Sequence, residues 1–150
     1  LLYIRRVSAT TTVSRVTPEY VAGGEQHILQ GKDIPDDVAV LRIHGPFLFG
    51  ATDKLDEATH DLERLPPIVI VRLRNMTAID GTGLEGLEDL VDRLRASGRT
   101  AIFCGARNQP RLLMERTGFP DHVGRQNFCP HVEAALARAA EVRAERLDGV

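Results

Sequence analysis

The feature that most constrains the fold is a regular alternation of strand-like and helix-like segments. Residues 68–73 (IVIVRL) and 100–104 (TAIFC) are short, nearly continuous apolar runs, which is the pattern of strands covered on both faces. Between them, apolar residues recur at helical spacing and form one stripe. Strands that alternate with helices predict a sheet flanked by helices. The stripe comprises Leu84, Leu87, Leu90, Val91 and Leu94.

The flanking segments continue the alternation in both directions. Residues 38–49 contain strand material interrupted by a Gly-Pro pair, which predicts a hairpin or a kinked strand pair. Residues 51–65 carry apolar side chains at helical spacing and stop at a Pro-Pro pair, so we expect a helix there. Further helices are predicted over residues 108–118 and 130–147. In the first of these, three side chains are expected to point inward: Leu112, Leu113 and Met114.

Together these segments predict an α/β fold. We expect a mixed sheet of roughly four to five strands, flanked by about four to five helices. The short connections favour a single layer of helices over the sheet. Residues 8–25 are rich in Thr, Ser and Gly without a sustained period, so they are interpreted as linker, and residues 28–29 are a candidate edge strand. The 150-residue length suits one domain with a real core.

Composition excludes several classes of function. The net charge is −2, Trp is absent and only 5% of residues are aromatic, so no nucleic-acid partner is expected. Cys104 and Cys129 lie 25 positions apart without CxxC spacing, which argues against a zinc site or redox pair and favours a reducing compartment. A long-range disulfide between them is the alternative. The histidines lack metal-ligand spacing and no nucleophile elbow is present, so we predict no enzyme, no metal site and no cofactor.

The junction at residues 78–84 (AIDGTGL) joins an apolar segment to the leucine-striped helix. A helix start with free backbone amides is able to bind an anion. However, the stretch lacks GxxxxGK[ST], contains no lysine and does not match a dinucleotide fingerprint, and Asp80 would repel a phosphate. We therefore favour a structural turn, in which Asp80 or Thr82 caps the helix and the glycines permit the turn.

The order of elements, with Asp-x-[Ser/Thr]-Gly-Leu at this junction, resembles a STAS domain. The residues that carry the resemblance are 38–52, 68–105 and 108–119, and with the last helix it covers roughly residues 38–145. The family includes bacterial anti-anti-sigma factors and the cytoplasmic tails of SulP-type anion transporters. GPFLFGA, in the first of these segments, resembles the transporter branch, where an apolar hairpin led by Gly and Pro precedes the first helix.

The start of the chain also resembles the transporter branch. LLYIRRV has no initiating Met and reads like the cytoplasmic end of a transmembrane helix, although the chain contains no apolar run long enough to span a bilayer. We expect residues 1–25 to be a juxtamembrane segment and linker that follow a transmembrane domain, and residues 26–150 to be the STAS domain. An equally open interpretation of LLYIRRV alone is a chance apolar start.

The resemblance implies a cytoplasmic C-terminal STAS domain of a bacterial SulP-family secondary anion transporter, at the cytoplasmic face of the inner membrane. Its role would be regulatory and based on protein contacts, without catalysis. The expected partner is the membrane domain of the same polypeptide. An acyl carrier protein or another soluble protein, and a second copy in the full-length transporter, are further candidates. The alternatives are a stand-alone partner switch similar to anti-anti-sigma factors and a nucleotide-binding STAS module.

One departure bears on the partner-switch alternative. In anti-anti-sigma factors the loop resembles Asp-Ser-Ser-Gly-Leu and its first Ser is phosphorylated, whereas Gly81 stands at that position here. Thr82 retains a hydroxyl and is the candidate for modification. The resemblance assigns the regulatory, partner-binding loop to Asp80, Gly81, Thr82, Gly83 and Leu84. A candidate basic patch, which would contact acidic lipid or an acidic partner unless it is simply a solvated face, comprises Arg107, Arg111, Arg116 and Arg125.

Overall fold

The structure, a computed structural model, describes residues 11–16, 34–49 and 51–149. A six-stranded sheet has the order β1-β2-β3-β5-β6, and β4 pairs with the far end of β2. β1 is antiparallel to β2 and the other pairs are parallel, so the predicted mixed α/β fold is confirmed. The strands are β1 (Thr12–Val16), β2 (Val38–Phe47), β3 (Ile68–Arg72), β4 (Met76–Ile79), β5 (Thr100–Cys104) and β6 (Phe128–Cys129).

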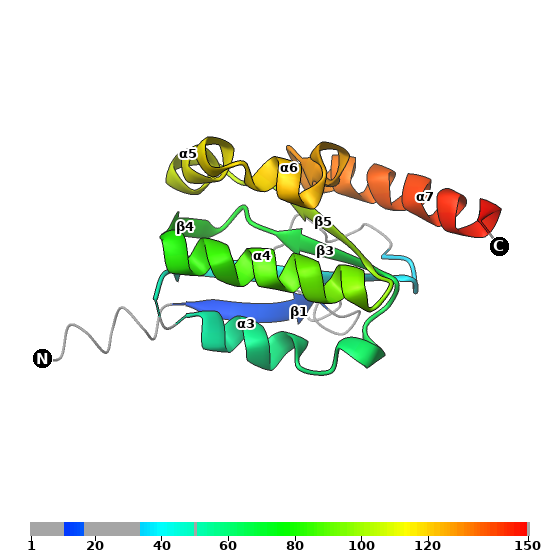
Figure 1. The fold of residues 1–150 in the computed structure, drawn as a ribbon, viewed down its shortest axis with the longest axis horizontal. Coiled ribbons are helices and arrows are strands. Elements are labelled where there is room, and N and C mark those ends of the chain that lie inside the picture. The colour runs from blue at the N-terminus through cyan, green and yellow to red at the C-terminus, as the bar shows by residue number, and fades with distance from the viewer. Residues whose placement is uncertain (1–10, 17–33, 50, 150) are drawn as a thin grey trace, which may run out of the picture.

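Helices cover both faces of the sheet. α4 crosses in front of the sheet in Figure 1, and its leucine stripe packs on that face together with apolar residues of α3, α5 and α6. The opposite face packs against α7. The helices are α3 (Thr52–Thr59), α4 (Gly81–Ala96), α5 (Asn108–Thr117), α6 (Phe119–Val123) and α7 (Val132–Asp148), with 3-10 turns at Leu62–Arg64 and Arg125–Asn127.

The expectation of a single helical layer is therefore wrong. Alternate residues of β3 divide between the two cores, with Val69 and Val71 on the α4 side and Ile68 and Ile70 on the α7 side. A strand that is apolar on both faces needs cover on both. α7 supplies the second cover.

Part of the predicted linker belongs to the sheet. Within residues 8–25, Thr12–Val16 forms β1 and pairs with β2 from Thr12↔His44 to Val16↔Val40. Only Val16 of this strand is buried, so the alternation that normally reveals a strand is absent. The linker interpretation is wrong for these residues. Residues 1–10 and the candidate edge strand at 28–29 lie outside the described residues.

β2 is one kinked strand rather than a hairpin. It pairs with β3 from Val38 to Arg42 and with β4 from Gly45 to Phe47, and the register of the β4 pairing shifts between Gly45 and Pro46. Gly45 has a φ of +90°, a conformation that favours glycine. The kink carries the end of β2 to β4, beside the start of α4.

The inward-facing set predicted for α5 is confirmed only in part. Leu112 is 65% exposed, whereas Leu113 is half-buried and Met114 is fully buried. α3 begins after Ala51 without a side-chain cap. Within the described part of the chain, no helix is both long enough and apolar enough to cross a membrane.

Candidate functional site

Asp80 is the residue around which the predicted loop is organised. It is the N-cap of α4, and its Oδ1 accepts a hydrogen bond from the backbone N–H of Gly83 at 2.8 Å. A carboxylate at a helix start satisfies a free amide and interacts favourably with the helix dipole. The capping interpretation is therefore confirmed for Asp80, and its negative charge occupies the start of this helix.

The second oxygen of Asp80 joins the loop to the end of β2. Asp80 Oδ2 accepts a hydrogen bond from the backbone N–H of Phe49 at 3.1 Å. The ring of Phe49 is not covered and the residue is 83% exposed. Gly81 and Thr82 are also exposed. We call the surface formed by Phe49, Asp80, Gly81 and Thr82 the loop surface.

The two glycines of the loop have different structural roles. A Cβ at Gly83 would lie 2.2 Å from the carbonyl oxygen of Phe47, so only glycine allows α4 to approach β2 this closely. Nothing lies within 4 Å of a Cβ at Gly81. Gly83 and Leu84 are buried, which makes them supports of the loop rather than contact residues.

Gln109 is a structural partner that the sequence pattern did not reveal. Its Oε1 accepts a hydrogen bond from the Ile79 N–H at 2.8 Å, and its Nε2 donates to the Ile79 carbonyl at 2.8 Å. The side chain thus completes the hydrogen bonding of the residue that precedes Asp80. A lone glutamine early in a helix carries no pattern from which this contact could be predicted.

The structure brings the predicted basic patch together only in part. All four arginines are exposed, but Arg125 pairs with Asp121 at 2.8 Å and Glu115 at 3.8 Å. Its hydrogen bond to Asp121 raises the pKa of Arg125. Arg107 and Arg111 line a cavity of about 290 Å³. Arg111 and Arg125 line a second cavity of about 230 Å³, and Arg116 lines neither of the two. Arg72 and Arg74 also line the 290 Å³ cavity, and the sequence pattern did not indicate either of them as a site residue.

The two cysteines are neighbours across the sheet. Cys104 of β5 and Cys129 of β6 are register partners, and both are free thiols, so the structure does not contain the alternative disulfide. Burial raises the pKa of the Cys104 thiol to about 12 and also raises the pKa of Cys129. Such thiols are poor nucleophiles at neutral pH. Among the described residues, no group of three or more His, Cys, Asp or Glu side chains is arranged to hold a metal ion.

Comparison with known proteins gives consistent matches. The family model described as STAS domain matches residues 32–135. The putative sulfate transporter YvdB of Bacillus subtilis (strain 168) is 25% identical over 132 residues, which are 87% of this chain but only 23% of that protein. This chain therefore corresponds to about a quarter of the relative's length.

Two solved structures resemble the fold over most of their length. A sulfate transporter family protein from Wolinella succinogenes has a TM-score of 0.71 and 27% identity, covering 79% of this chain and 96% of that one. The SulP transporter STAS domain from Vibrio cholerae has a TM-score of 0.64 and 29% identity, covering 75% of this chain and 88% of that one. With the family model matching well over half of its residues, this chain belongs to the STAS domain family.

Proposed function

We propose that this chain is the cytoplasmic C-terminal STAS domain of a bacterial SulP-family secondary anion transporter, and that it regulates transport through protein contacts without catalysis. Support comes from the relatives that are named as sulfate transporters or SulP domains. The chain matches nearly all of the two separate structures but only 23% of YvdB, as expected of one domain within a longer transporter.

The proposed location is the cytoplasmic face of the inner membrane, with the membrane domain of the same polypeptide as the main partner. Residues 1–25 were expected to lead from that domain. Because β1 belongs to the sheet, we now propose that the juxtamembrane segment ends before Thr12. The loop surface is the proposed contact with the membrane domain.

One observation carries the docking role: Phe49 is 83% exposed beside Asp80, which fixes its backbone. An exposed aromatic side chain loses unfavourable contact with water when a partner covers it. A rigid backbone lowers the entropy that docking must overcome. The loop surface therefore combines an apolar anchor with a preorganised support.

Cell fractionation tests the transporter assignment. Source cells would be separated into membrane and supernatant fractions and probed with an antibody against residues 38–145. We expect a band far larger than 16.5 kDa that stays in the membrane pellet after an alkaline wash. A band near 16.5 kDa in the supernatant would contradict the assignment and favour the stand-alone partner switch.

The docking role has its own test. Binding of the 150-residue chain to the detergent-solubilised membrane domain would be measured for Phe49→Ala and for Leu147→Ala, which truncates an apolar residue that is also exposed (70%). We expect Phe49→Ala to weaken binding by about tenfold, as for an interface anchor, and Leu147→Ala to leave it unchanged. Equal affinities for the two variants would rule out Phe49 as the anchor.

The partner-switch alternative specifically requires that Thr82 is phosphorylated. Thr82 is exposed in the first turn of α4, where a phosphate would add nearly two negative charges beside Asp80. Phosphopeptide mass spectrometry of the chain purified from source cells tests this. Phosphate on Thr82 would favour a switch, and unmodified Thr82 under all growth conditions would leave the loop as a docking surface only.

A further inference from the structure

The cavity lined by Arg107 and Arg111 lies at the carboxyl end of the parallel strands, on the α7 side of the sheet. β3 contributes Arg72, which is the register partner of Cys104 in β5 and of Arg42 in β2. Strand alternation places Arg72 on the face of Ile68 and Ile70, which pack with α7. Two arginines thus lie side by side on a covered face of the sheet.

Arg72 is buried without a hydrogen-bonded partner among the described residues. Only 5% of the residue is exposed, and among the described residues no group accepts a hydrogen bond from its guanidinium or forms an ion pair with it. Burial lowers the pKa of Arg72, and the charge of Arg42 acts in the same direction, while Cys104 and Glu133 oppose the change. A buried charge is unfavourable unless it is paired and hydrogen bonded.

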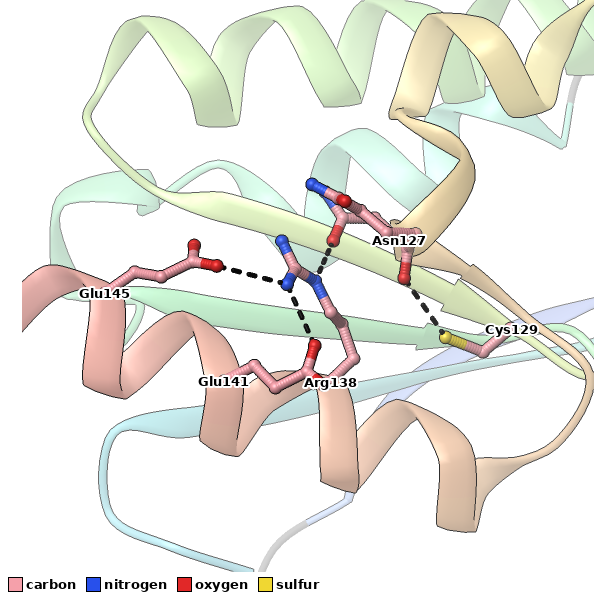
Figure 2. A network of polar contacts seen from close by, with 6 residues as sticks. Asn127, Cys129, Arg138, Glu141 and Glu145 are labelled. Atoms are coloured by element: carbon pink, nitrogen blue, oxygen red, sulfur yellow. Dashed lines mark hydrogen bonds and ion pairs between the residues drawn. The ribbon is translucent and has the colours of Figure 1, made fainter.

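Arg138 provides a comparison, because it is a buried arginine whose guanidinium is paired within the protein. It is 9% exposed, and Figure 2 shows its guanidinium surrounded by acceptors. Nε donates to Asn127 Oδ1 at 2.7 Å, and one terminal nitrogen contacts Glu141 at 3.0 Å and Glu145 at 3.4 Å. Arg72 is buried at least as deeply but lacks such a set. The difference indicates that the partner of Arg72 is not part of the described protein.

The cavity beside Arg72 is lined by positively charged side chains, as expected of an anion-binding site. Its volume is about 290 Å³, and four arginines line it: Arg72, Arg74, Arg107 and Arg111. No Asp or Glu of the described chain is among the lining residues. Arg107 is held in place because its Nε donates to the Arg74 carbonyl at 3.0 Å. Guanidinium groups present planar pairs of donors that match the oxygens of sulfate and phosphate.

The start of α7 adds to this positive potential. His131, the N-cap, and Val132, the first helical residue, both line the cavity. α7 has 17 residues, and the positive end of its dipole lies at this start. The ring of His131 accepts from the Ala134 N–H at 3.1 Å and lies 3.2 Å from Glu133, the carboxylate nearest to the helix start.

We propose that this cavity binds a dianionic tetrahedral oxyanion, either free sulfate or phosphate or the terminal phosphate of a small phosphomonoester. Arg72 at the base and Arg111 at the mouth are the principal ligands. The open cavity of about 290 Å³ admits one such group with a small substituent. The site is separate from the loop surface, and it does not depend on the proposed role in transport.

Binding is measured by isothermal titration calorimetry of the 150-residue chain with sodium sulfate, sodium phosphate and AMP, each against sodium chloride at equal ionic strength. We expect saturable binding of the oxyanions and none of chloride. Equal affinity for the three oxyanions would identify free sulfate or phosphate as the ligand. Tighter binding of AMP would identify a phosphomonoester as the ligand. Titration curves that match chloride would overturn the proposal.

Variants locate the site. Arg72→Met keeps an unbranched stem but removes the guanidinium and its charge. Arg111→Ala truncates an exposed ligand, and Arg116→Ala is the control from the same helix outside the cavity. We expect the first two to weaken binding by about tenfold or more, as for lost charged hydrogen bonds, and the control to have no effect. If Arg111→Ala binds the oxyanions as tightly as the parent, the proposal is wrong. This test remains valid even if Arg72→Met does not fold.

Discussion

Asp80 and Phe49 are joined by a hydrogen bond from the Phe49 backbone N–H to the Asp80 carboxylate, although the residues lie 31 positions apart. The other oxygen of the same carboxylate caps α4 through Gly83. One side chain thus holds the start of a helix and the segment that follows the kinked strand. This link gives the loop surface a defined shape without a bound partner.

Asp80→Ala removes both contacts of the carboxylate. Loss of a helix cap typically costs about 0.5–2 kcal/mol, so we expect the free energy of unfolding to fall by about 1–2 kcal/mol. Urea denaturation followed by circular dichroism measures this change. Asp89→Ala, at an exposed carboxylate within α4, is the control and should cause no loss. Equal stability of Asp80→Ala and the parent would show that the cap contributes nothing.

The two loop glycines give a matched pair of substitutions. Gly83→Ala places a Cβ 2.2 Å from the Phe47 carbonyl oxygen, and we expect this clash to cost about 1–3 kcal/mol. Gly81→Ala meets open space and a helical backbone, so its effect should be neutral or stabilising by up to about 1 kcal/mol. Thermal unfolding of both variants makes the comparison. A less stable Gly81→Ala than Gly83→Ala would contradict the close approach of α4 to β2.

Cys104 should make the stability of the domain depend on pH in the alkaline range. Burial raises its folded-state pKa from 9.0 to about 12, so the thiol stays protonated in the folded chain while it ionises in the unfolded chain. The contribution is fully present below about pH 9 and is lost as the pH rises to about 12.

Within that window, we expect the free energy of unfolding to fall by about 1.4 kcal/mol per pH unit from this group. Urea denaturation at several pH values would show a shallower decline for Cys104→Ala. If the free energy of unfolding falls equally steeply with pH in the parent and in Cys104→Ala, the assignment of this pH dependence to Cys104 is wrong. In the native chain at pH 8, a thiol reagent should modify half-buried Cys129 before Cys104.

Asp37 ties the start of β2 to α7. Its Oδ1 and Oδ2 accept hydrogen bonds from the Arg143 guanidinium at 2.8 and 2.5 Å. The hydrogen bond from Arg143 lowers the pKa of Asp37 below 3.8. The pair therefore contributes stability above about pH 3.8, and this contribution is lost as the pH falls through the lowered pKa.

Both side chains of this pair are about one-third exposed, so Asp37→Asn should cost at most about 1 kcal/mol at pH 7. The difference from the parent should vanish at strongly acidic pH. Asp36→Asn, at the adjacent exposed residue, is the control for the charge change. A loss of stability equal to that of the control would mean that the pair with Arg143 has no net effect.

The segments with strong periodicity were predictable from the sequence. The runs at 68–73 and 100–104 are strands, the leucine stripe faces the core, and Asp80 caps the helix that carries it. In each case the local pattern and the tertiary environment favour the same structure. β1 was not predictable, because an edge strand with one buried residue gives no alternation.

The sequence by itself determined the alternation of strands and helices from residue 38 onward and the composition of the loop, since these depend on local spacing and on residues close along the chain. Its resemblance to STAS domains indicated the class of the fold. Only the tertiary structure decided that α7 covers the second face, that Phe49 lies beside Asp80, and that Arg72 meets Arg107 and Arg111 at one cavity. Strand pairing and crossover connections bring these residues together. Such long-range contacts leave no periodic signal in the chain.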